Sequence, residues 1–72
     1  MDVETARREI IQLETSVKRE RDQAQYAIQM SHAETNRKHK SARVAESRRC
    51  EDNARQIQAR IDELQRLIAE NS

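Results

Sequence analysis

Apolar residues recur at steps of three and four near both ends of the chain. Near the N-terminus this spacing connects Val3, Ala6, Ile10, Leu13 and Val17. Near the C-terminus it connects Ile57, Ile61, Leu64 and Ile68. Such steps place side chains on one face of an α-helix and are typical of the seam of a coiled coil. We therefore predict a helix with one apolar stripe at each end.

The middle of the chain does not extend the first stripe in steps of seven. From Val17 such steps would place charged residues, among them Glu20 and Lys38, in a buried core. Steps of eleven instead connect Val17, Ile28, His39, Cys50 and Ile61. An eleven-residue repeat predicts a middle that is nearly straight or slightly right-handed. A competing stripe consists of Tyr26, Met30, Ala33 and Val44.

Composition favours helix over every other element. The 72 residues include no Gly and no Pro, which turns and strand ends usually require, and 38% of them are charged. Acidic residues precede basic ones by four positions at Glu4 and Arg8 and at Glu14 and Lys18, a spacing that stabilises helices. We predict an all-α chain that forms a single long helix of roughly 105 Å. Because one helix cannot bury its own stripe, we expect a two-stranded coiled coil.

The two end stripes are mirror images about residue 37, since paired positions such as Ile10 and Leu64 have numbers that sum to 74. This symmetry fits the layers of an antiparallel coiled coil, so we predict an antiparallel homodimer with heptad ends and an eleven-residue-repeat middle. The predicted dimer interface comprises Val3, Ala6, Ile10, Leu13, Val17, Ala24, Ile28, His39, Cys50, Ala54, Ile57, Ile61, Leu64 and Ile68.

Three other arrangements remain open at this point. The same mirror symmetry fits a helical hairpin within one chain, with residues 34–40 as its turn. A parallel dimer would stack each residue on its own copy. Small residues such as Ala24, Ala42 and Ala54 leave room for a third or fourth helix.

Basic residues concentrate in the middle, although the formal net charge is only +1. The candidate contacts to a polyanion are Arg37, Lys38, Lys40, Arg43, Arg48 and Arg49. They favour, as an alternative function, a helix that binds nucleic acid or an acidic polymer. The absence of stacking aromatic residues from this block disfavours nucleic acid as the partner.

No pattern of catalytic or metal-ligating residues is evident. His32 and His39 lie seven residues apart, with Cys50 eleven further on, which is a poor spacing for zinc ligands. We expect a non-enzymatic chain with no cofactor and no metal. The single cysteine suggests a reducing compartment. No apolar run is long enough to span a membrane, so we do not expect the chain to bind one.

By periodicity and composition the chain resembles a segment of long coiled-coil scaffold proteins of the cytoskeletal or centriolar type. The resemblance implies one coiled-coil segment over residues 1–72, a fragment of a larger protein, that acts as a homodimeric rod or spacer. It also implies a cytoplasmic, cytoskeleton-associated location. The expected partners are a second copy of the chain, higher assemblies of it and other scaffold proteins.

Overall fold

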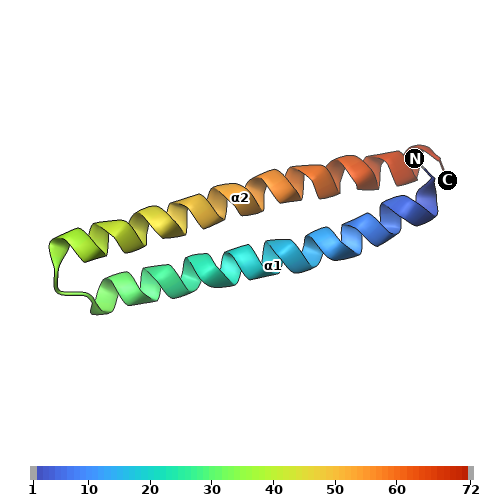
Figure 1. The fold of residues 1–72 in the computed structure, drawn as a ribbon. Helices are drawn as coiled ribbons and strands as arrows, with labels where there is room; N and C mark the ends of the chain where they lie inside the picture. Colours follow the sequence, from blue (N-terminus) through green and yellow to red (C-terminus); the bar gives the residue numbers. More distant parts are fainter. Residues whose placement is uncertain (1, 72) are drawn as a thin grey trace.

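The chain folds into two long helices joined by a short turn, as seen in a computed structural model that describes residues 2–71. Helix α1 spans Val3–Ala33 and helix α2 spans Arg37–Glu70. The chain reverses direction between them, so the helices lie side by side, and the start of α1 and the end of α2 lie at the same end of the molecule (Figure 1). The result is a rod with extents of 54 × 14 × 13 Å. The described residues contain no strand.

The predicted single helix is wrong because the helix stops at Ala33 and restarts at Arg37. Glu34 and Asn36 both adopt extended backbone, with φ of −85° and −80°. The Asn36 side-chain oxygen accepts hydrogen bonds from the backbone N–H groups of Lys38 and His39, which is N-cap geometry. The Glu34 carboxylate accepts a hydrogen bond from the Asn36 N–H at 3.1 Å. This turn lies within the stretch that the hairpin alternative assigned to it.

A turn without Gly or Pro is possible because it needs no unusual backbone. No residue in the described part of the chain has a positive φ, so the freedom of glycine is not required here. Closing the two apolar stripes on each other within one chain also buries them without a second molecule. That burial favours the break over one continuous helix, whose stripe would face water.

The buried positions, and some of the half-buried ones, follow three-four steps along most of each helix. In α1 they are Val3, Ala6, Ile10, Leu13, Val17, Glu20, Ala24, Ala27 and Ser31, and in α2 they are Arg43, Ser47, Cys50, Ala54, Ile57, Ile61, Leu64 and Ile68. We call these two sets together the seam. The turn shifts the phase between the two sets. The eleven-residue step from Val17 to Ile61 assumed one continuous helix, and the chain between them is not one helix. Within α1 the first stripe instead continues in steps of seven from Val17 to Ala24 and Ser31, contrary to the expectation, with Glu20 half-buried beside it.

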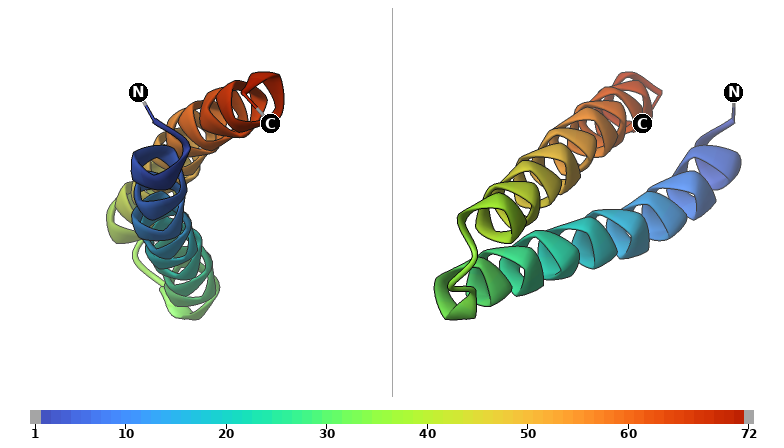
Figure 2. Two further views of the ribbon diagram at one scale, coloured as in Figure 1. Left: turned by 90° about the vertical axis from the view of Figure 1, so that its right-hand side faces the viewer. Right: turned by 60° about the vertical axis from the view of Figure 1, so that its left-hand side comes forward.

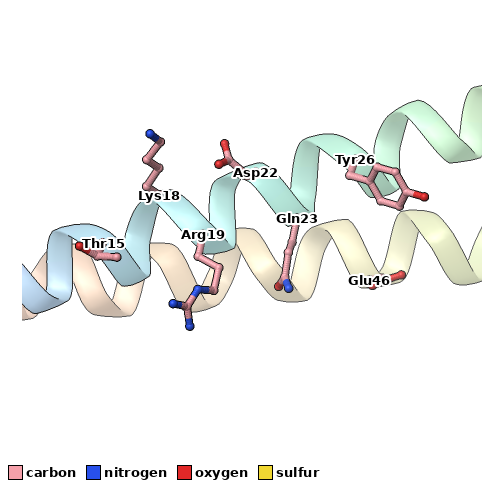
Figure 3. Close-up of a pocket in the computed structure, with 7 residues that line it drawn as sticks. All are labelled: Thr15, Lys18, Arg19, Asp22, Gln23, Tyr26 and Glu46. Atoms are coloured by element: carbon pink, nitrogen blue, oxygen red, sulfur yellow. The ribbon is translucent and has the colours of Figure 1, made fainter.

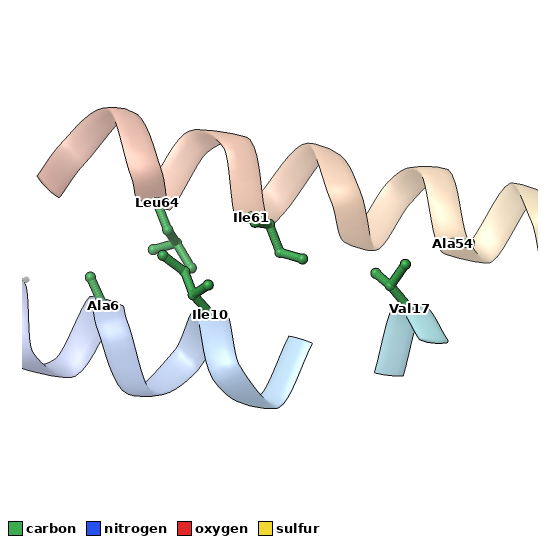
Figure 4. Close-up of a cluster of buried hydrophobic side chains, with 6 residues drawn as sticks. All are labelled: Ala6, Ile10, Val17, Ala54, Ile61 and Leu64. Carbon is green, nitrogen blue, oxygen red and sulfur yellow. The ribbon is translucent and has the colours of Figure 1, made fainter. Parts of the chain in front are cut away.

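Bulky side chains fill the terminal half of the seam, and small ones fill the half near the turn. Ile10, Val17, Ile61 and Leu64 form the buried cluster with Ala6 and Ala54, and Figure 4 shows Ile10 and Leu64 pointing toward each other. Near the turn the buried residues are Ala24, Ala27, Ser31, Ser47 and Cys50. Within the described residues no other element covers the outer faces of the helices (Figure 2).

Candidate interaction surfaces

The residues predicted for the dimer interface lie between the two helices of one chain. All of them are buried or half-buried except His39, which is exposed in the first turn of α2. His39 is therefore not part of the seam. Its Nδ1 lies 3.8 Å from the Glu34 carboxylate, so it faces the turn. His39 and Cys50 both lie in α2, so the eleven-residue step between them does not cross the break. His39 is exposed because α1 ends at Ala33 and little of it lies opposite the first turn of α2.

Contacts across the helices give the register of the hairpin. The hydroxyl of Ser47 donates to the Ala24 carbonyl at 3.0 Å, and the Arg60 guanidinium lies 3.3 Å from the Glu9 carboxylate. The residue numbers of these pairs sum to 71 and 69, which places the symmetry point near residue 35, in the turn. The contact of Gln23 with Cys50 and the facing pair Ile10 and Leu64 have sums of 73 and 74, so the contacts together centre within about two positions of the predicted residue 37.

Two buried serines belong to the seam and were missed from the sequence. Ser31 is 1% exposed and its hydroxyl donates to the Ile28 carbonyl at 2.7 Å, while Ser47 is 2% exposed. Because both hydroxyls have acceptors, their burial carries no cost of an unpaired polar group. The detectable signal was the three-four spacing of small residues, Ala24, Ala27 and Ser31, rather than of large apolar ones.

Cys50 is the free cysteine of the chain and lies in the seam with 6% of its surface exposed. Burial raises the pKa of its thiol, and the nearby Glu20 carboxylate raises it further. Its Sγ lies 3.9 Å from Oε1 of Gln23 across the helices. A buried neutral thiol of this kind is a packing residue and a poor nucleophile.

The predicted basic residues occupy the turn half of α2 but do not form one cluster. Arg37, Lys40 and Arg48 line a shallow hollow of about 390 Å³ on its outer face, whose floor includes Val44. Arg43 instead lies 3.7 Å from the Glu46 carboxylate. Ser41 and Ala45 complete the lining of this hollow. Lys38 and Arg49 are exposed and lie outside it. The first turn of α2 contains no acidic residue, so the positive end of the helix dipole adds to these charges.

A larger hollow, of about 570 Å³, lies on the outer side of α1 where it meets α2. Its lining residues are Thr15, Lys18, Arg19, Asp22, Gln23, Tyr26 and Glu46. Figure 3 shows Arg19 and Gln23 extending across the face of α2, while Lys18 extends away from it. The ring of Tyr26 borders the hollow and is 60% exposed. The competing pattern had placed Tyr26 in an apolar stripe, but Tyr26 is exposed and is not part of a buried one.

The described residues contain no group of three or more His, Cys, Asp or Glu side chains that could hold a metal ion. His32 and His39 are both exposed, and Cys50 is buried. No described helix is long and apolar enough to cross a membrane.

Comparison with protein-family models, with curated proteins and with solved structures gave no significant match.

Proposed function

We propose that the chain is a non-enzymatic structural module, a short antiparallel coiled coil that forms homodimers and acts as a spacer in a larger scaffold. The observation that carries the coiled-coil part of the proposal is the seam itself. It follows three-four steps along both helices, and the surfaces outside it are rich in charged residues. This division is characteristic of helices selected for association.

The shape supports a scaffold role. The rod is 54 Å long and 14 Å wide, and the first and last described residues lie at the same end (Figure 1). Inserted in a longer chain, such a hairpin would project from it as an arm. The resemblance of the sequence to cytoskeletal and centriolar scaffold proteins supports a cytoplasmic, cytoskeleton-associated setting, with other scaffold proteins as further partners.

Sedimentation equilibrium of the 72-residue chain tests this function. The monomer mass is 8.5 kDa, so a homodimer would show twice that value over a range of loading concentrations. Small-angle X-ray scattering on the same samples reports whether the particle is elongated. A mass that stays at 8.5 kDa up to millimolar concentration would contradict the proposal.

A second candidate function is the binding of an acidic polymer at the turn end. It is supported by the hollow that Arg37, Lys40 and Arg48 share, together with the acid-free first turn of α2. We expect polyglutamate to bind with an affinity that falls as salt rises. Replacing these three residues with Gln would weaken binding and flatten the salt dependence, whereas replacing Arg7 and Arg66 would not. Equal losses for both sets would exclude a defined site.

A further inference from the structure

We propose that a second copy of the chain docks on the outer face of α1, antiparallel to the first, so that Ile11 of each copy packs against Tyr26 of the other. This inference rests on the proposed self-association and specifies the surface that performs it. The seam is already occupied within the chain. Dimerisation of intact hairpins therefore requires a different face.

Helix α1 has such a face. Ile11 is 66% exposed and Tyr26 is 60% exposed, and they are the large hydrophobic residues that the described chain leaves exposed. The steps from Ile11 through Thr15, Lys18 and Asp22 to Tyr26 are four, three, four and four residues. Such steps keep all five side chains on one side of the helix, away from the seam. We call these five residues the outer stripe.

The outer stripe has room for a partner side chain. Four of its members, Thr15, Lys18, Asp22 and Tyr26, line the hollow of about 570 Å³. In an antiparallel pair with a two-fold axis between Lys18 and Arg19, Ile11 of the second copy would enter the region beside the Tyr26 ring. The same contact repeats on the other side of the axis, which makes the interface self-complementary. In this register Lys18 of each copy lies opposite Arg19 of the other, and Asp22, one turn from Lys18 of the other copy, offsets part of this like charge.

The chain exposes more surface than a compact protein of the same mass, and a second copy could cover this excess. The chain exposes 5640 Å², whereas a compact protein of the same mass exposes about 4,700 Å². The excess of about 1,000 Å² is comparable to the roughly 800 Å² that each partner buries in a standard interface. A second hairpin laid along the first would cover an area of this size.

Charge selects the antiparallel orientation. Residues 18–50, which form the turn half, contain nine basic and four acidic residues, a net charge of +5. Residues 2–17 and 51–71, which form the terminal half, contain five basic and nine acidic residues, a net charge of −4. An antiparallel pair places each positive half beside a negative one, whereas a parallel pair would place like charges together.

This orientation explains how a hairpin acts as a spacer. The termini of the two copies would emerge at opposite ends of the assembly. The points where the two parent chains attach would then be separated by about the length of the rod, 54 Å.

Sedimentation equilibrium of single variants tests the interface. Ile11→Lys and Tyr26→Lys should each raise the dimer dissociation constant about tenfold or more, because a charge replaces an apolar contact. Gln56→Lys adds the same charge at an exposed position on α2 and should leave the constant within about twofold. Far-UV circular dichroism checks that helicity is unchanged, as expected for exposed positions.

The outcomes distinguish the outer-stripe interface from the more general proposal that the chain forms homodimers. If the wild type dimerises and both outer-stripe variants weaken it, the inference is supported. If the wild type dimerises and neither variant weakens it, the outer stripe is not the interface, although self-association stands. A wild type that remains monomeric overturns both proposals.

Disulfide crosslinking tests orientation in a Cys50→Ala background. Mixing the Ile11→Cys chain with the Tyr26→Cys chain should give mainly the mixed crosslink, because these positions face each other in the antiparallel pair. Crosslinking of Ile11→Cys mainly to itself would indicate a parallel pair and overturn the proposed orientation.

Discussion

Truncating Leu64 to Ala should destabilise the hairpin more than truncating its neighbour on the same helix. Leu64 is 0% exposed and belongs to the buried cluster with Ile10 and Ile61. A buried Leu→Ala change costs about 2–5 kcal/mol, and two helices can close partly around the gap, so we expect about 2–3 kcal/mol here. A chain of 72 residues has about 4–11 kcal/mol of stability at typical values per residue. The change would therefore remove a large share of the total.

Urea unfolding followed by circular dichroism measures this effect. Leu67→Ala is the matched control, because Leu67 is only partly buried against the same cluster. We expect it to cost about 1 kcal/mol, in proportion to the smaller apolar area buried. Both variants should be compared at one protein concentration, since the proposed dimerisation would add stability that depends on concentration. Equal costs for Leu64→Ala and Leu67→Ala would refute the view that the seam holds the helices together.

Three further predictions concern the helix caps and the cysteine. Asn36→Ala removes the N-cap of α2 and should cost about 0.5–2 kcal/mol in urea unfolding, whereas Asn36→Asp should not. Hydrogen bonds from Thr5 hold the pKa of Asp2 below its ordinary value of 3.8, so the folded state favours the charged carboxylate. That contribution is present above pH 3.8 and disappears as pH falls through the lower folded pKa, so the unfolding midpoints of wild type and Asp2→Asn should differ at pH 6 and converge as pH falls below the folded pKa. Cys50 should react with iodoacetamide far more slowly in the folded chain than in urea, and equal rates would show that it is not buried.

The helices and most seam residues could be predicted from the sequence because the hydrophobic pattern is local and strong. Ile10, Val17, Ile61 and Leu64 are all buried, as their three-four spacing indicates. The open question was whether each stripe meets a stripe in the same chain or in another chain. Periodicity alone cannot answer that question, since the hairpin and the antiparallel dimer of long helices bring together similar residues.

The turn was considered only as an alternative because its signals in the sequence are weak. Asn36 is a strong N-cap, and Glu34 stabilises the same turn through its side chain, but neither signal is as visible as Gly or Pro. Assuming a continuous helix then carried the wrong phase into the middle of the chain, and it hid that His39 would lie in the exposed first turn of a second helix. The buried small residues near the turn, such as Ser47, were missed because small polar residues are weak markers of a core.

The pairing of the two helices within one chain is tested most directly by a distance measured inside that chain. Nitroxide labels at Arg7→Cys and Gln65→Cys, both exposed, in a Cys50→Ala background would report it by electron–electron double resonance. Labelled chains should be diluted with unlabelled chains to remove distances between copies. Packed helices lie about 8–10 Å apart, so with the label arms we predict a distance under about 30 Å. A distance near 87 Å, which is about 1.5 Å for each of the 58 residues between the labels, would show a continuous helix and contradict the hairpin.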